Sequence, residues 1–343
     1  MRLAVVIPAL HRPDLTARCV QSFLQQGCAQ SDNEIIVVEN DAANGPVLPE
    51  PLPPRVRRLE LERNFGFTGA ANRGIAAASS EYILLLNNDV ELLPGFVNAL
   101  LAKMESDPLC AIAGGKLLSA ADRAMLDGAG DAWLLGGGAY RLGHGDRDQG
   151  QFDAINPLSC CGAALLLRRS ALDQIGLLDE DFFAYLDDVD LALRARLAGF
   201  HVAFVPQARA LHVGSATLGE AQHPKAIEWI TRNQTLVLVK NYPASLLFRL
   251  LPRIAVFHTL WFLRAVSQAR FIALLRGIFG ALRLLPRAWQ KRRHIQSRRK
   301  LTSDNLLKEL QKSEAQVAAW QQSLSSERQS KLLSAYFAIC GRP

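Results

Sequence analysis

Several common signatures are missing from this 343-residue sequence. Its six cysteines form no Cys-x-x-Cys pair, which argues against a zinc ribbon or a dithiol redox motif. Neither a Walker lysine motif nor G-x-G-x-x-G occurs, so the P-loop and dinucleotide-binding fingerprints are excluded. The apolar run after Met1 is too short for a secretory signal and leads straight into polar sequence, so we expect a first strand there. Together these absences favour free thiols in a reducing compartment.

Charge is distributed unevenly along the chain. From Pro243 onward there are 18 Lys and Arg against 4 Asp and Glu, whereas the first 242 residues carry 21 basic and 28 acidic side chains. An acidic body followed by a basic tail indicates either two functions or one function performed at an anionic surface. Nearly half of the residues are apolar, which is enough for a sizeable core.

The first 110 residues alternate strand-like and helix-like patterns. Apolar runs at 3–10, 33–40 and 81–89 read as buried strands, 56–64 as a further strand, and 15–26 and 68–80 as helices. This alternation predicts a doubly wound α/β sheet flanked by helices. Residues 111–242 continue the same domain, with a Gly-rich loop at 136–145 and strands near 161–169 and 201–206.

Ligands of such sheets bind at the carboxyl ends of the strands. Three positions meet that rule: Pro8, the pair Glu39 and Asp41, and the segment 87–89. Asp89 follows a buried strand, where one carboxylate can hold Mg²⁺ or Mn²⁺ if the substrate supplies the other oxygens. Asn-Asp sequences are also common in ordinary turns, and acidic loops are often only solvated, so each stretch alone is ambiguous.

The stretch 63–74 adds glycines that allow close backbone approach, with Thr68 expected to cap the following helix. The segment 182–199 begins with an aromatic group and then opens a helix with Asp187 and Asp188. Helix capping explains one of these carboxylates. A general base at the rim of a sugar-sized pocket explains both and the aromatic wall. Asp190 and Arg194 read as an i,i+4 surface pair.

The basic tail is predicted to be helical. Its longest charge-free run, 254–263, is about half the length needed to cross a bilayer, so we expect no membrane span. Arg249, Arg253 and Arg264 fall within a wedge of about 60°, typical of helices lying in the membrane interface. Core helices with solvated arginines are the alternative. The last polar helix carries apolar residues at helical spacing. This pattern suits pairing with another helix, as would occur in a homodimer.

In their order along the chain, these motifs resemble the family-two inverting glycosyltransferases of the GT-A fold, and most of all their rhamnosyltransferase-like bacterial branch. The resemblance covers residues 2 to about 240 and includes VVIPALHRPDLTARC, RNFGFTGAANRG, LLLNNDVEL and DEDFFAYLDDVDLALRARLAGF. It implies a GT-A domain over 1–242, with a nucleotide-binding half at 1–110 and an acceptor half at 111–242. Residues 243–343 would form the amphipathic helical tail.

The resemblance also implies roles for single residues. Asp188 matches the catalytic base, with Asp187 in place of the family's usual glutamate, and Asp89 matches the carboxylate that binds Mg²⁺ or Mn²⁺, with His212 as a further metal ligand. The nucleotide-sugar site would comprise Pro8, Glu39, Asp41, Asn64, Gly66, Asn72, Asn87 and Asn88.

The expected reaction is one displacement at the anomeric carbon, in which a base takes the acceptor proton while a cation neutralises the leaving nucleoside diphosphate. The implied partners are a nucleotide sugar, a glycan or lipid-linked acceptor, and the anionic inner face of the plasma membrane. A sugar nucleotidyltransferase is one alternative. A basic nucleic-acid binder is another, but the tail alternates arginines with apolar residues instead of forming a continuous basic groove, so we expect no nucleic-acid partner.

Overall fold

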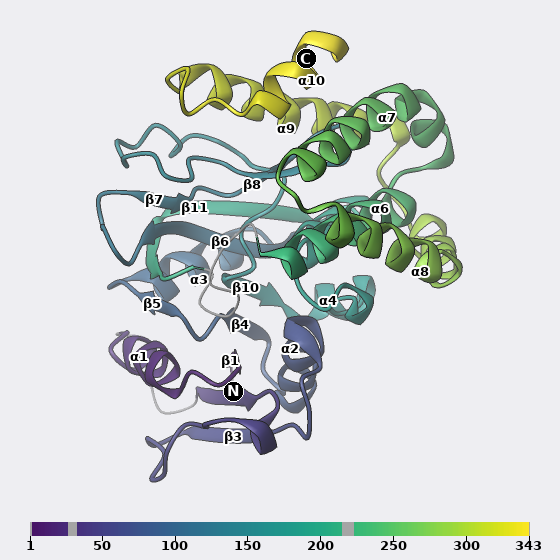
Figure 1. The fold of residues 1–343 in the computed structure, drawn as a ribbon. Coiled ribbons are helices and arrows are strands. Elements are labelled where there is room, and N and C mark those ends of the chain that lie inside the picture. Colours follow the sequence, from purple (N-terminus) through teal and green to yellow (C-terminus); the bar gives the residue numbers. More distant parts are fainter. Residues whose placement is uncertain (1, 27–32, 215–222, 343) are drawn as a thin grey trace.

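The computed structural model describes residues 2–26, 33–214 and 223–342 (Figure 1). Strands and helices alternate through the first part of the chain, as predicted. The strands are β1 (Leu3–Ala9), β2 (Glu34–Glu39), β3 (Val56–Glu60), β4 (Tyr82–Leu86), β5 (Val90–Leu92), β6 (Cys110–Ser119), β7 (Leu126–Gly128), β8 (Asp131–Trp133), β9 (Ala139–Arg141), β10 (Ala164–Arg168) and β11 (His201–His212). The helices of this part are α1 (Pro13–Leu24), α2 (Gly66–Ala77), α3 (Phe96–Ser106), α4 (Arg169–Ile175) and α5 (Asp187–Leu197).

The central sheet is mixed, with the order β3-β2-β1-β4-β10-β6-β11-β5 and with β7 paired to β6. Strands β3, β2, β1 and β4 run parallel, β10 runs antiparallel to both of its neighbours, and β6 and β11 are again parallel. The predicted α/β sheet flanked by helices is confirmed. The antiparallel β10 separates the four parallel strands β3, β2, β1 and β4 from β6, β11 and β5.

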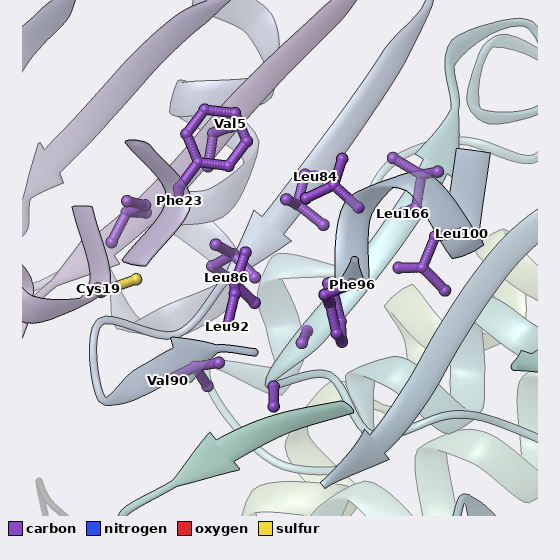
Figure 2. Packing of buried hydrophobic residues seen from close by; sticks show 14 of the residues in the cluster. Val5, Cys19, Phe23, Leu84, Leu86, Val90, Leu92, Phe96, Leu100 and Leu166 are labelled. Atoms are coloured by element: carbon purple, nitrogen blue, oxygen red, sulfur yellow. The ribbon is translucent and has the colours of Figure 1, made fainter. Parts of the chain in front are cut away.

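Each face of the sheet carries its own apolar layer. Figure 2 shows the layer in which Phe23 of α1 and Phe96 of α3 pack against strand residues such as Val5, Leu84 and Leu166. On the opposite face, α2, α4 and α5 cover the alternate side chains of the same strands. Because both faces are covered, β1 and β4 are wholly buried, which explains their nearly continuous apolar sequences.

Two local expectations are corrected. Thr68 does not cap α2, because the helix begins at Gly66; Thr68 lies buried in the first turn, where its N–H donates to the carbonyl of Phe183 at 3.2 Å. Asp190 and Arg194 are not a surface pair either. Both are buried, they form an ion pair of 2.8 Å, and Arg194 also donates to the carbonyls of Ile175 and Leu177 at and after the end of α4.

The C-terminal region is helical, as expected. It consists of α6 (Pro224–Asn241), α7 (Ala244–Ser267), α8 (Phe271–Ser297), α9 (Ser303–Ser323) and α10 (Lys331–Cys340). Figure 1 shows α6, α7 and α8 gathered on one side, with α9 and α10 beyond β8. Leu306 and Leu310 of α9 share an apolar cluster with Trp133 and Leu135, so the seam expected to pair with another helix packs onto the body of its own chain.

Helix α7 departs from one expectation. Its 24 residues are long enough and apolar enough to cross a membrane by length and composition, with a mean hydropathy of 1.5 in the most apolar window. The ten-residue charge-free run had suggested that no segment would pass this test. Only 17% of that window is buried, and Phe248, Leu251, Phe262, Leu263 and Val266 of this helix are exposed.

Candidate active site

The residues predicted at strand ends gather at one edge of the sheet. Register pairs Ala9 with Glu39 and Val6 with Leu85, so β1, β2 and β4 end side by side. Pro8 is buried within β1, Glu39 is the last residue of β2, and residues 87–89 follow β4. The observed register therefore places these groups at a common edge, as the strand-end rule predicts.

Glu39 and Asp41 face different partners. Glu39 is buried and its Oε1 accepts a hydrogen bond from the N–H of Leu48 at 2.7 Å. Burial raises the pKa of this carboxyl, and the Leu48 N–H and Arg58 oppose that rise. Asp41 adopts a left-handed backbone with φ of 76°, and its carbonyl lies 3.0 Å from Nε2 of His11. The loops after β1 and β2 are thus joined above the sheet edge.

Three predicted residues shape the neighbouring loop and helix start. Asn64 Oδ1 accepts from the N–H of Gly66 at 2.8 Å and from the Asn40 amide at 3.0 Å. Gly66 has a φ of +75°, and a Cβ there would lie 2.6 Å from the carbonyl oxygen of Phe183, so only glycine fits this contact. Asn72 exchanges hydrogen bonds with the backbone of Leu178. Gly66 and Asn72 thus pack α2 against the segment 178–183, which precedes Asp187 and Asp188, and Asn64 joins the start of α2 to the loop after β2.

The segment after β4 brings a carboxylate to a histidine. Asn88 donates to Thr16 Oγ1, while the buried Oδ1 of Asn87 has no hydrogen-bond partner in the part of the chain that the structure describes. Asp89 Oδ1 lies 3.4 Å from Nε2 of His212, at the end of β11. Ligands at about 2.1 Å from one divalent ion lie roughly 3 Å apart, so both atoms fit a single Mg²⁺ or Mn²⁺.

A third residue, not expected from the sequence, supports this pair. Nδ1 of His212 lies 2.8 Å from Oδ2 of Asp127, on β7. A carboxylate that accepts from one ring nitrogen of a histidine turns the other nitrogen toward a metal, as is usual in metal sites. The arrangement Asp127–His212–Asp89 therefore has both the ligand atoms and the orienting partner that a bound cation needs.

The charges of His212, Asp127 and Asp89 strongly affect the pKa values of His212 and Asp127. Burial alone would lower the pKa of His212, but the carboxylates of Asp127 and Asp89 outweigh burial and raise the pKa to about 9. Burial would likewise raise the pKa of Asp127, but His212 and Arg141 bring it down to about 2. The cluster thus favours positive charge at Nε2 of His212, either a proton or a cation that takes its place.

Asp187 and Asp188 begin α5 after an unusual turn. Phe183, Tyr185 and Leu186 all have positive φ, between 62° and 69°, a conformation that costs about 1 kcal/mol or more for each residue that is not glycine. Asn233 of α6, fully buried, donates from Nδ2 to the carbonyls of Ala184 and Tyr185 at 2.8 Å. This side chain, which sequence reasoning missed, holds the turn.

Both oxygens of Asp188 accept from backbone N–H groups, those of Gly162 and Val189, each at 2.8 Å. Burial raises the pKa of Asp188, and these two bonds oppose the rise. Asp187 is more deeply buried. Burial and then the charge of Asp188 raise its pKa well above the usual value. The two N–H bonds fix the direction of the lone pairs of Asp188, as a general base requires.

A short series of contacts links the pair Asp89 and His212 to Asp188 at the start of α5. Arg141 of β9 donates to Asp127 Oδ2 at 2.8 Å, and its Nε lies 3.7 Å from Asp131 Oδ1. Asp131 in turn has a carboxylate oxygen within 4.8 Å of one of Asp188. Asp127, Asp131 and Arg141 all lie around the Gly-rich loop, whose function the sequence left open.

Parts of this chain are similar in sequence to known proteins. The O-antigen biosynthesis protein RfbC of Myxococcus xanthus is 28% identical over 239 residues, which cover 67% of this chain and 19% of that protein. An N-acetylglucosaminyl-diphospho-decaprenol L-rhamnosyltransferase of Mycobacterium tuberculosis is 30% identical over 188 residues, covering 46% of this chain and 59% of that one. The chain thus spans less than two thirds of the length of either relative.

A solved structure supports the fold. The crystal structure of GalNAc-T7 with UDP, GalNAc and Mn²⁺ superposes with a TM-score of 0.57 at 14% identity, over 76% of this chain and 51% of that one. Residues 4–176 also match the family described as Glycosyl transferase family 2. With half of the sequence matched and a GT-A type of sheet carrying the expected motifs, the chain belongs to glycosyl transferase family 2.

Proposed function

We propose that this protein is an inverting glycosyltransferase that moves a sugar from a nucleoside-diphosphate sugar to a hydroxyl of a glycan or lipid-linked acceptor, in the synthesis of a cell-surface polysaccharide. The observation that carries the proposal is the pairing of Asp89 and His212 as cation ligands within a few contacts of Asp188. The name of the mycobacterial relative supports dTDP-rhamnose as the first donor to test, with UDP-hexoses second.

Each residue then has a defined task. The acceptor O–H transfers its proton to Asp188 as the acceptor oxygen bonds to the anomeric carbon, and the bond from that carbon to the diphosphate oxygen breaks. Asp89 and His212 would hold Mg²⁺ or Mn²⁺, with Asp127 orienting the imidazole. When bound, the cation neutralises the charge that develops on the departing nucleoside diphosphate. Glu39 and Asp41 would line the nucleoside.

The test is a panel of nucleotide sugars with Mg²⁺ or Mn²⁺, scored by release of nucleoside diphosphate. We expect Asp188→Asn to keep the fold and to lose about 10²–10⁴ in turnover, the usual contribution of a general base. Asp173→Asn, which changes an exposed aspartate on α4, serves as the control. Release of pyrophosphate would instead identify a nucleotidyltransferase, and near-normal transfer by Asp188→Asn would remove the base assignment.

A membrane surface is the second proposed partner, with the protein at the cytoplasmic face of the plasma membrane. Helices α7 and α8 expose a set of large apolar side chains, here termed the α7–α8 face: Phe248, Leu251, Phe262, Leu263, Val266, Phe271, Ile272, Ile278, Phe279, Leu282 and Trp289. Arginines of the same helices, among them Arg249, Arg276 and Arg283, alternate with them. This combination suits a helix pair that lies in the interface of an anionic bilayer.

A further inference from the structure

Arg141 lies between the two chemical centres of the candidate site. Its Nη1 contacts the carboxylate of Asp127, which orients His212, and its Nε approaches the carboxylate of Asp131, beside Asp188. Neither Arg141 nor Asp131 has a part in the reaction proposed above. Both come from the hairpin β8–β9, which packs next to α5 and α9 but contributes no strand to the main sheet.

Asp131 is a costly residue at its position. Its side chain is only 9% exposed, and its buried Oδ2 has no hydrogen-bond partner among the described residues. Burial of an incompletely bonded carboxylate costs free energy, and such groups are concentrated at functional sites. The groups that face it are Asp188 from α5, Arg141 from β9, Asp127 from β7 and the thiol of Cys161 before β10.

We propose that Arg141 and Asp131 are opposed positioning residues for Asp188: the guanidinium favours the ionised base, and the neighbouring carboxylate disfavours it. The proposal deepens the proposed function, because it assumes Asp188 as the base. Coulomb's law gives the direction of each effect, since opposite charges within a few ångströms stabilise ionisation and like charges oppose it.

The titration behaviour of the buried groups agrees with this geometry. Burial, and then the charge of Asp188, raise the pKa of Asp131 to about 7, while Arg141 counteracts that rise. Burial also raises the pKa of Asp188, and the N–H groups of Gly162 and Val189 and then Arg141 lower it; Asp187 and the thiol of Cys161 are the other titratable groups that face it. Because the interaction between two charges is mutual, an ionised Asp131 raises the pKa of Asp188 just as Asp188 raises that of Asp131, so the two carboxyls titrate as a pair.

A bound cation is a weaker explanation of the same cluster. Ligand atoms of Asp131, Cys161 and Asp188 lie within 4.8 Å of one another. However, both oxygens of Asp188 already accept backbone N–H groups, and the guanidinium of Arg141 lies beside Asp131. A second cation would be repelled by that guanidinium.

The test uses two variants of the full chain that should move one titration in opposite directions. The N–H of Gly162 donates to Oδ2 of Asp188, so its amide NMR signal reports the ionisation of that carboxylate without any need for activity. Arg141→Gln removes the cation and should raise the midpoint of that titration by about one pH unit or more. Asp131→Asn, of equal size, removes the competing charge and should lower it.

The acid limb of kcat/KM should move in the same directions, since the protonated base is inactive. Arg141→Lys should restore most of the wild-type midpoint, and Arg123→Gln, on an exposed loop, should leave it unchanged. General structural damage cannot produce opposite shifts. Shifts in one direction, or no shift of the Gly162 signal, would overturn the proposal. Opposite shifts in a protein that transfers no sugar would leave the coupling in place and refute the proposed function.

Discussion

At the scale of single residues, His212 depends on a neighbour for its chemistry. Because Asp127 is hydrogen-bonded to Nδ1 of His212, the imidazole ring is fixed in orientation and its Nε2 faces Asp89. A histidine held by a carboxylate is a better metal ligand than a free one, because its tautomer is set before the ion arrives. The state of the cation site should therefore depend on Asp127, although Asp127 itself is not one of the proposed ligands.

We predict that Asp127→Asn weakens Mn²⁺ binding about 10- to 100-fold, the usual effect of losing such an orienting partner. The affinity can be measured by the electron paramagnetic resonance signal of free Mn²⁺, independently of turnover. The chain offers a matched control at the other end of β11, where His201 and Asp107 form an exposed pair at 3.0 Å. Asp107→Asn should leave the affinity unchanged, and an equal loss in both variants would refute the assignment.

Which of these residues the sequence could reveal depends on distance along the chain. Asp89 and Asp188 follow apolar runs and stand in recognisable motifs, so they were predicted from local pattern and resemblance. Asp127 contacts His212 across 85 positions and Asn233 contacts the 182–186 turn across about 50. No local periodicity encodes such pairings, because they arise only when β7 and α6 pack against elements elsewhere in the chain.

At the scale of elements, α5 is fixed by charges buried between three helices. Lys240 of α6 lies 2.8 Å from Asp190 of α5 and also pairs with Asp179, which Lys291 of α8 contacts as well. The lysine and both aspartates are nearly or fully buried. Burying such ions is costly, so removal of one partner leaves the others only partly compensated. This network connects the helix that carries Asp188 to the C-terminal region.

We predict that Lys240→Met destabilises the protein by about 3 kcal/mol, the lower end of the cost of breaking a buried pair, because Asp179 keeps Lys291 and Asp190 keeps Arg194 as the remaining cationic partner. Urea unfolding provides the measurement. Lys225→Met on the same helix is the matched control, since its pair with Glu228 is exposed and contributes only about 0.2–0.5 kcal/mol. Equal losses in the two variants would show that the buried pair contributes no more than the exposed one.

The same prediction has a pH dependence. Burial would raise the pKa values of Asp179 and Asp190, but Lys240 reverses this and lowers both. Carboxyls with lowered pKa stabilise the fold above their unfolded pKa of about 3.9, and this contribution disappears as the pH falls through the folded values. The stability difference between wild type and Lys240→Met should therefore shrink below about pH 4.

At β6 the sequence pattern did not reveal a strand, because glycines that the packing requires interrupt it. Strand β6 lies in the middle of the sheet, yet Gly114 and Gly115 weaken its pattern in the sequence. A Cβ on Gly115 would lie 2.1 Å from the carbonyl oxygen of Ala208, so the irregular pairing of β6 with β11 requires glycine there. By contrast, β1, β2 and β4 are covered on both faces, and their uninterrupted apolar runs made them predictable.

At the scale of the whole molecule, the basic tail and the acidic body are one packed unit. Tyr336 of α10 donates to Glu314 of α9, which accepts in turn from the backbone N–H of Leu135. Arg253 of α7 pairs with the same glutamate. Truncation at residue 243 would uncover these groups together with the apolar cluster around Trp133. The membrane proposal is therefore better tested by point substitutions in the full chain.

We predict that the full chain binds vesicles of phosphatidylglycerol and phosphatidylethanolamine through the α7–α8 face. Phe279 is 67% exposed on α8, and Phe279→Asp should reduce binding about 10- to 100-fold, because one inserted phenylalanine contributes about 1.5–3 kcal/mol. Leu109→Asp is the control, since Leu109 is 50% exposed but lies outside this face. Added salt should weaken binding further by screening the arginines from anionic lipid.

The competing occupant of this face is a second copy of the chain, and one further measurement separates the two. Sedimentation at several protein concentrations gives the mass in solution without lipid. If the α7–α8 face were a dimer interface, Phe279→Asp would convert a dimer into a monomer, and the wild type would not bind vesicles. If it meets lipid, the mass stays the same in both proteins while only vesicle binding falls, because an interfacial helix pair loses affinity through each apolar side chain it can no longer insert.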